Sequence, residues 1–145
     1  GMYPVDHGMT GLDPVRPDSF YGVAKVFGEN MLRYYLDKHG IESVSLRIGS
    51  FEERPSQQRH LSTWLSPRDA VELFDRSLRQ PGVGAAIVFG MSRNTRIRIA
   101  HPNWEAVGFQ PFLNLYGGSI SSVSSMTPSA RSFARFAVMA RVMSS

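Results

Sequence analysis

The stretch DSFYGVAKVFGENMLRYYLDKHG at residues 18–40, followed by SVSLRI at residues 43–48, decides the fold of this chain. In the first segment apolar residues recur at three- and four-residue steps, which predicts an amphipathic helix over residues 18–39. Ser19 suits the N-cap of that helix, and Gly40 stands where a helix C-terminus favours glycine. In the second segment apolar and polar residues alternate, which predicts a strand.

A second helix and strand follow the first pair. Ser66 and Pro67 suit the cap and the first turn of a helix that ends near Arg79. We expect four of its apolar side chains to be buried: Ala70, Val71, Phe74 and Leu78. The apolar run AAIVFG at residues 85–90 is typical of a strand buried in a parallel sheet. Helix and strand therefore alternate, which predicts an α/β fold, and two strands are too few for a complete sheet.

The segments around these elements carry weaker signals. Residues 1–17 are rich in Gly, Pro and Asp and predict a loop, and residues 49–63 predict a second loop of functional length. A short helix is expected near residues 103–107.

The composition is that of a folded domain. Of 145 residues, 42% are hydrophobic and 19% are charged, so neither a disordered chain nor a membrane protein is expected. The chain has no apolar run long enough to span a bilayer and no basic and apolar leader, and we expect a cytoplasmic protein. Cysteine is absent and the four histidines lack metal-ligand spacing, so neither disulfides nor a metal site is predicted.

The positive charge is concentrated at the end of the chain. Residues 1–111 carry a net charge of +1 and residues 112–145 carry +3, within a formal total of +4. The arginines are dispersed rather than clustered with aromatic residues, so we expect no nucleic-acid binding. Residues 112–145 are rich in serine and arginine and lack acids. We interpret them as a tail, either disordered or forming a short amphipathic helix within residues 129–143, and expect no membrane contact from it.

Tyr21 and Lys25, both on the predicted helix, are the candidate catalytic residues. Their spacing of four residues places the phenol and the ammonium group on one helical face, one turn apart. A free tyrosine has a pKa near ~10, and a neighbouring cation favours its phenolate form. A phenolate held in this way can accept a proton from a substrate hydroxyl while a hydride leaves the same carbon.

Several blocks of sequence surround this pair: PDSFYGVAK at 17–25, FGE at 27–29, LRIGS at 46–50, Arg59, TWLS at 63–66, VFG at 88–90 and VGFQP at 107–111. Together they resemble the extended short-chain dehydrogenase/reductase family, within it the NAD-dependent epimerase/dehydratase group, and most closely the uronate dehydrogenases. The resemblance covers residues 1–111, which we interpret as a partial domain of that kind. It implies the C-terminal portion of a Rossmann-type doubly wound parallel sheet.

The resemblance also implies a role for five residues. Tyr21 would be the catalytic base, and Lys25 would bind the nicotinamide ribose of NAD and favour the phenolate. Ile48 and Ser50 would line the nicotinamide and substrate pocket at the carboxyl end of a parallel strand. Arg59 would hold the carboxylate of a sugar-acid substrate, which suits the paired geometry of a guanidinium group, although a solvated loop arginine is the competing interpretation.

Two parts that the family uses have no counterpart in the sequence as given. The glycine-rich phosphate loop that follows a first strand is not found, and the catalytic serine some 25 residues before the tyrosine would precede Gly1. We therefore expect a fragment that begins late in the domain, lacks the N-terminal glycine-rich strand-helix unit and is inactive alone.

The resemblance predicts NAD-dependent oxidation of a hexuronic acid at its anomeric carbon to an aldarolactone. A nucleotide-sugar epimerase or dehydratase is the alternative within enzymes, but only 17 residues, 49–65, separate the first strand from the next helix cap. The alternative from another class is a non-catalytic interaction module. In the family the Tyr/Lys helix also packs between subunits, so Phe27, Met31 and Tyr34 would favour a homo-oligomer.

Overall fold

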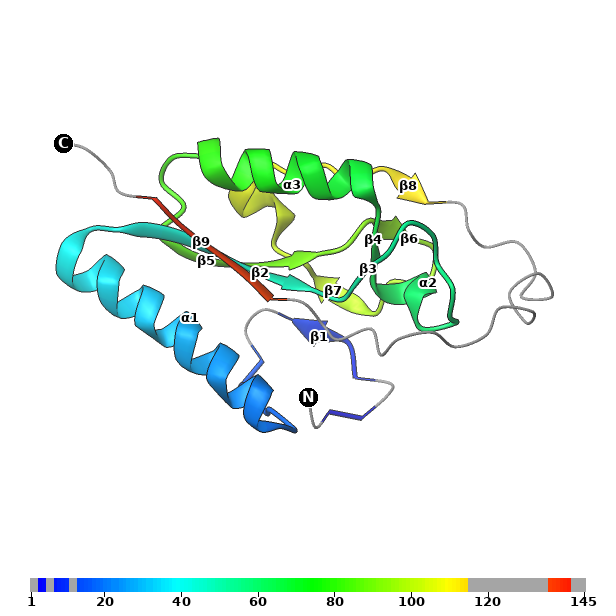
Figure 1. Cartoon of the computed structure of the whole chain (residues 1–145), viewed down its shortest axis with the longest axis horizontal. Coiled ribbons are helices and arrows are strands. Elements are labelled where there is room, and N and C mark those ends of the chain that lie inside the picture. Colours follow the sequence, from blue (N-terminus) through cyan, green and yellow to red (C-terminus); the bar gives the residue numbers. More distant parts are fainter. Residues whose placement is uncertain (1–2, 5–6, 11–12, 115–135, 142–145) are drawn as a thin grey trace.

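The computed structural model describes residues 3–4, 7–10 and 13–114, together with the backbone of residues 136–141. At its centre is a three-stranded sheet in the order β5-β2-β9. Strand β2 (Glu42–Ile48) pairs in parallel with β5 (Ala85–Gly90) and antiparallel with β9 (Phe136–Arg141). Helix α1 (Phe20–His39) lies on one side of the sheet and α3 (Pro67–Arg79) on the other (Figure 1). The predicted α/β fold is confirmed, and β9 makes the central sheet mixed rather than purely parallel.

Helix α1 begins and ends where the sequence predicts. The hydroxyl of Ser19 accepts a hydrogen bond from the backbone N–H of Gly22 at 3.2 Å, which satisfies one of the unpaired donors of the first turn. Gly40 adopts a φ of 66°, a left-handed conformation that glycine enters without steric cost, and its N–H donates to the carbonyl of Leu36 at 2.9 Å. Both caps are local signals and were therefore readable from the sequence.

Helix α3 has the predicted bounds but buries a different face. Ser66 caps it through a hydrogen bond from Asp69 N. Ala70 is buried as expected, and Phe74 packs at the edge of the core. The prediction was wrong for Val71 and Leu78, which are 73% and 50% exposed. The buried positions are instead Asp69, Ala70, Leu73 and Ser77. Ser77 tolerates burial because its hydroxyl donates to the carbonyl of Leu73 at 2.7 Å.

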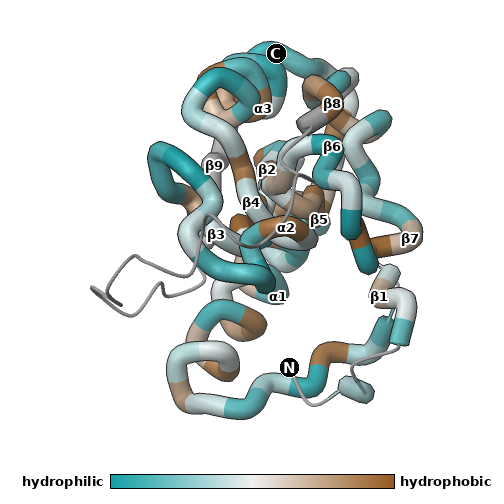
Figure 2. The backbone as a smooth tube through the Cα atoms, turned by 90° about the vertical axis from the view of Figure 1, so that its right-hand side faces the viewer, coloured by the Kyte–Doolittle hydropathy of each residue, from teal (hydrophilic) through white to brown (hydrophobic). Residues whose placement is uncertain are grey.

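The hydrophobic core lies between the two central parallel strands and α3. Figure 2 shows hydrophobic stretches of β2 and β5 between α3 and α1. The buried side chains of this core are Val44, Leu46, Ile48, Leu65, Ala70, Leu73, Val88, Val107 and Phe109. Val44, Leu46 and Val88 are essentially inaccessible, so β2 and β5 form the rigid part of the molecule on which the site is built.

Shorter elements complete the structure. The 3-10 helix η1 (Trp104–Val107) confirms the helix expected near residues 103–107. Strand β1 (Met9–Thr10) pairs with β7 (Ile99–His101), so the first predicted loop contains one strand. The second predicted loop contains β3 (Ser50–Phe51) and the one-turn helix α2 (His60–Thr63). Strand β3 pairs in parallel with β4 (Trp64–Leu65). Together they shape the approach to the carboxyl end of β2.

Parts of residues 112–145, the segment interpreted as a tail, form strands. Strand β8 (Leu113–Asn114) pairs with β6 (Arg93–Asn94), so contacts with the body continue past residue 111. Residues 136–141 form strand β9, not the helix considered within residues 129–143. As a strand, residues 136–141 form backbone hydrogen bonds with the edge of β2. The spacing of apolar residues within the segment cannot predict this pairing, because it depends on a strand that is distant in the sequence. Residues 115–135 and 142–145 lie outside the described residues, and the division at residue 111 stays a prediction.

Across the part of the chain that the structure describes, no helix combines the length and the hydropathy needed to cross a membrane.

Candidate active site

A cleft of about 350 Å³ opens between α1, the loop before it and the carboxyl ends of β2 and β5. Residues 13–19 of the loop form one wall. The floor includes Ile48 and Gly49 at the end of β2 and Phe89 and Met91 at the end of β5. Ligands bind at this end of the strands in open α/β sheets, because the loops that leave the sheet there diverge.

The loop wall is held together by polar contacts. The carboxylate of Asp13 accepts hydrogen bonds from the backbone N–H of Thr10 at 2.6 Å and from its hydroxyl at 3.2 Å, and lies 3.2 Å from His7 Nε2. The Thr10 backbone bond is the main cause of a lowered pKa of Asp13. Pro17 lies so close to α1 that a Cβ on Gly22 would come within 3.0 Å of the proline side chain. The loop therefore fits tightly against the first turn of the helix.

Tyr21 and Lys25 lie together on the α1 side of the cleft. Tyr21 is in the first turn of the helix and is 47% exposed, and Lys25 follows one turn later. The Lys25 ammonium lies 5.1 Å from the centre of the Tyr21 ring. Both residues line the cleft, so the structure brings together the two side chains singled out from their spacing.

The same helical face continues to Glu29, which the sequence analysis did not assign. Glu29 also lines the cleft and is bound to Arg47 of β2 by two hydrogen bonds of 2.8 Å each. The sequence does contain a signal for Glu29, because its position four residues after Lys25 places it on the same helical face as Tyr21 and Lys25. The pairing with Arg47 depends on how α1 packs on β2, which spacing along one element does not reveal.

Ile48 lies on the floor of the cleft as the resemblance implied, and Gly49 beside it allows a close approach of α2. A Cβ at Gly49 would lie 2.6 Å from Thr63 Cβ and 2.7 Å from its carbonyl oxygen. Only a residue without a side chain fits between the end of β2 and Thr63. Thr63 lines the cleft as well, and it is a second site residue that the sequence analysis left unassigned.

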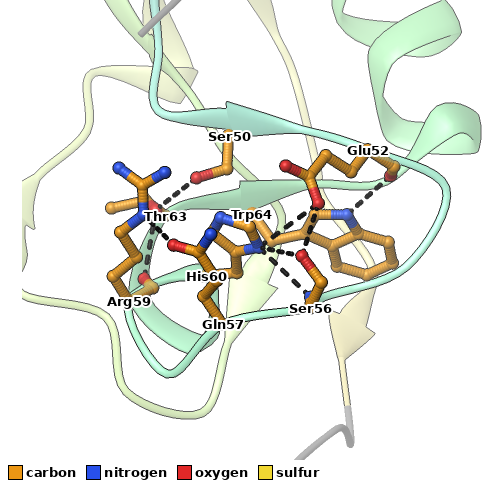
Figure 3. A network of polar contacts seen from close by, with 8 residues as sticks. All are labelled: Ser50, Glu52, Ser56, Gln57, Arg59, His60, Thr63 and Trp64. Carbon is orange, nitrogen blue, oxygen red and sulfur yellow. Dashed lines mark hydrogen bonds and ion pairs between the residues drawn. The ribbon is translucent and has the colours of Figure 1, made fainter. Parts of the chain in front are cut away.

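Ser50 and Arg59 are not among the residues that line the cleft, but Thr63 connects them to it (Figure 3). The Thr63 hydroxyl donates to the carbonyl of Arg59 at 3.1 Å and lies 2.9 Å from Ser50 Oγ. A hydroxyl has one proton, so Ser50 donates to Thr63 and its own oxygen keeps lone pairs for a donor. Ser50 is 2% exposed. Toward any further partner, the Ser50 hydroxyl can therefore act only as a hydrogen-bond acceptor.

The side chain of Arg59 points along the exposed surface of the loop. Its Nε donates to Gln57 Oε1 at 2.7 Å. Arg59 immediately precedes α2, so its backbone is tied to Thr63 while its guanidinium is held by a neighbouring loop residue. A carboxylate ligand would have to compete with Gln57 for the guanidinium group of Arg59.

His60 is the buried centre of a second polar network in Figure 3. It is completely inaccessible, and its Nδ1 accepts a hydrogen bond from Ser56 N at 3.2 Å. The Ser56 hydroxyl donates to Glu52 Oε2 at 2.7 Å, and that oxygen lies 3.6 Å from His60 Nδ1. Trp64, 4% exposed, donates from Nε1 to the carbonyl of Glu52 at 2.8 Å and is a packing residue. The network fixes the loop that carries Arg59.

Burial lowers the pKa of His60 below its ordinary value of 6.5; the Glu52 carboxylate opposes this effect and the Arg59 charge adds to it. Between this lowered pKa and pH 6.5, the unfolded chain therefore binds a proton at His60 that the folded state does not bind. The contribution of His60 to stability is complete above about pH 6.5 and is lost as the pH falls through that value toward the lowered folded pKa. We expect the melting temperature of the chain to decrease between about pH 7.5 and pH 5.5, measured by circular dichroism.

Two variants isolate the residue responsible. His60→Asn keeps an oxygen acceptor for Ser56 N but cannot take up a proton, so the melting temperature should depend less on pH than in the wild type. His101→Asn removes an exposed histidine from β7 and should leave the pH dependence unchanged. Asp13 does not interfere, because a carboxylate with a lowered pKa titrates below this range. An unchanged slope in His60→Asn would assign the effect to other groups.

The fold and the cleft define an α/β unit with a tyrosine and a lysine beside the carboxyl ends of its parallel strands. Residues 1–68 match the sequence model of the NAD dependent epimerase/dehydratase family. This match and the relatives described below confirm the resemblance noted in the sequence.

Several proteins similar to this chain are dehydrogenases of sugar acids. The chain is 42% identical over 111 residues to a uronate dehydrogenase of Pseudomonas putida, a match that covers 77% of this chain and 41% of that protein. The structure superposes on a glucuronic acid dehydrogenase from Chromohalobacter salexigens with a TM-score of 0.78 and 30% identity, over 90% of this chain and 49% of the other. A variant of the uronate dehydrogenase of Agrobacterium tumefaciens solved with NAD gives a TM-score of 0.74 and 35% identity, over 85% and 46%. The chain thus spans less than half the length of these relatives.

Proposed function

We propose that this chain carries the Tyr–Lys part of an NAD-dependent dehydrogenase that oxidises a hexuronic acid at its anomeric carbon to an aldarolactone. The observation that carries the proposal is the cleft at the carboxyl end of β2, with Tyr21 and Lys25 on one helical face beside it. The similarity to uronate and glucuronic acid dehydrogenases supports the substrate class.

NAD is the proposed cofactor, and the residues of the cleft fit its nicotinamide end. Ile48, Phe89 and Met91 give the floor an apolar surface suited to a flat ring, and the ammonium of Lys25 can donate to ribose hydroxyls. When bound, NAD would supply the acceptor for the hydride that leaves the anomeric carbon.

Tyr21 is the proposed base. Its phenolate would accept the proton of the anomeric hydroxyl while the C–H bond breaks and a C=O bond forms, so that one proton and one hydride leave the sugar. The cation of Lys25 would favour the phenolate because it lies 5.1 Å from the ring centre, in a cleft with an apolar floor. Tyr21 is thus proposed as the residue that holds the proton at the end of the step.

Ser50 and Arg59 are proposed to bind the sugar. The hydrogen bond that Ser50 donates to Thr63 leaves its oxygen as an acceptor, and a sugar hydroxyl would have to reach it past Thr63, because Ser50 itself does not line the cleft. Arg59 would exchange its contact with Gln57 for the substrate carboxylate, which can accept two parallel hydrogen bonds from a guanidinium group. The network around His60 would keep this loop in place.

A nucleotide-sugar epimerase or dehydratase is the competing activity. Such an enzyme must accommodate a much larger substrate, whereas residues 49–65 between β2 and α3 contain only β3, α2 and β4. This short connection leaves little chain for an additional binding lobe and favours a small sugar acid.

The test is a chimeric enzyme in which residues 1–111 of this chain replace the corresponding part of the Pseudomonas putida uronate dehydrogenase. We expect NADH formation with galacturonate and glucuronate, and much less with galactose or a UDP-hexose. The 145-residue chain alone, assayed in parallel, should show no turnover. A folded chimera that binds NAD and oxidises none of these sugars would favour the non-catalytic interaction module, and one that acts only on the UDP-hexose would favour the epimerase or dehydratase.

Self-association through α1 is also proposed. Of the residues expected to drive it, Phe27 and Tyr34 are exposed and Met31 is half-buried; Phe20 and Val23 of the same helix are also exposed. Exposed apolar side chains repeated along a helix are typical of a protein–protein contact. Sedimentation equilibrium of the chain would detect it, and a monomer at all concentrations would contradict it.

A further inference from the structure

Glu29 and Arg47 form an ion pair inside the cleft that the proposed reaction leaves unexplained. Nε of Arg47 donates to Oε1 of Glu29 and Nη2 donates to Oε2, each at 2.8 Å. The Glu29 side chain is 7% exposed and that of Arg47 is 22% exposed. The guanidinium carbon also lies 5.6 Å from the centre of the Phe89 ring. The two parallel bonds and the aromatic contact hold both charges in fixed positions.

The pair lies on the face of α1 that carries the proposed base. Tyr21, Lys25 and Glu29 are spaced four residues apart, so their side chains follow one another along a single face. All three line the same cleft as Arg47. A glutamate four residues from a lysine is normally an attractive partner for it, and an uncompensated carboxylate at this position would weaken the effect of Lys25 on Tyr21.

We propose that Arg47 is a positioning residue for the Tyr21–Lys25 pair: it cancels the charge of Glu29, so that the positive charge of Lys25 acts on the phenol undiminished. The inference rests on the proposed function of Tyr21 as a base. Arg47 touches neither reacting atom in this account and acts through Glu29 and Lys25. The same pair fastens α1 to β2, so a purely structural role is the interpretation to be excluded.

The electrostatic role predicts opposite effects for the two single substitutions. Arg47→Met leaves the Glu29 carboxylate uncompensated one helical turn from Lys25 and should make ionisation of the Tyr21 phenol harder. Glu29→Gln leaves an additional guanidinium cation and should make that ionisation easier. The double substitution Glu29→Gln/Arg47→Met has no net charge at the site and should return the titration close to the wild type. A structural role alone would disturb all three variants without this change of sign.

The titration can be followed in the chain itself, without any enzymatic activity. The chain has five tyrosines, and labelling their Cζ carbons with ¹³C gives one nuclear magnetic resonance signal for each phenol, assigned to Tyr21 by its loss in Tyr21→Phe. We expect the midpoint of the Tyr21 signal to move up in Arg47→Met and down in Glu29→Gln. Asp75→Asn, which breaks the exposed Asp75–Arg79 pair of α3, should not move it.

Two single variants that move the midpoint in the same direction, or a double variant that does not return toward the wild type, would overturn the proposal. If Arg47→Met does not fold, as far-ultraviolet circular dichroism would show, the downward shift in Glu29→Gln and its cancellation in the double variant decide the question. Because no turnover is measured, these outcomes are distinct from failure of the proposed dehydrogenase activity. An inactive chimera with the expected shifts would contradict only the function, and an active chimera without them only the role of Arg47.

Discussion

Tyr21→Phe in the chimeric enzyme should lower the rate of uronate oxidation by at least ~10²-fold. The substitution removes the phenolic oxygen and keeps the ring, so packing against the loop before α1 is preserved. Phenylalanine cannot accept the proton of the anomeric hydroxyl, and water, a much weaker base than a phenolate, would have to take its place. The initial rate of NADH formation at saturating substrate measures the effect.

A matched control exists on the same helix. Tyr35 is 41% exposed and Tyr21 is 47% exposed, so Tyr35→Phe removes a comparable hydroxyl from α1 outside the cleft and should leave the rate unchanged. Lys25→Met should also lower the rate, because the ring of Tyr21 then loses the ammonium group that lies 5.1 Å from its centre. Near-normal turnover in Tyr21→Phe would show that the base has been assigned wrongly.

Arg59→Ala should raise the KM of the same enzyme for galacturonate and glucuronate by about one to two orders of magnitude, the usual value of a charge-assisted hydrogen-bonded pair. It should hardly change the KM for galactose, which has no carboxylate. Arg59→Lys should restore part of the loss, since an ammonium group keeps the charge but cannot form two parallel hydrogen bonds. Steady-state kinetics with acid and neutral sugars in parallel provide the comparison.

The structure makes this a demanding test, because Arg59 donates to Gln57 and is not among the residues that line the cleft. Arg54→Ala removes an exposed arginine from the same loop and serves as the control. If Arg59→Ala changes the KM for acid and neutral sugars equally, Arg59 is a surface residue of the loop. The preference for uronates would then have to come from another cation of the cleft, such as Arg16.

Parts of the site that lie on a single element were predictable from the sequence. Tyr21 and Lys25 share a face because the helical repeat fixes it, and Ile48 reaches the cleft because it ends a strand. Parts that depend on contact between elements were not. Thr63 reaches the cleft because Gly49 lets α2 approach β2, and Arg47 meets Glu29 because α1 packs on β2.

The ends of the main helices and strands follow from local features of the sequence. Caps such as Ser19 and Gly40 act within one turn, and the alternating pattern of β2 and the apolar run of β5 each specify a strand. By contrast, α3 faces the core with Leu73 rather than Val71, and residues 136–141 extend along β2, because of contacts between elements. Caps and periodicity act between residues close in the sequence, whereas a buried face or a strand partner is chosen by surfaces that meet only after the chain has folded.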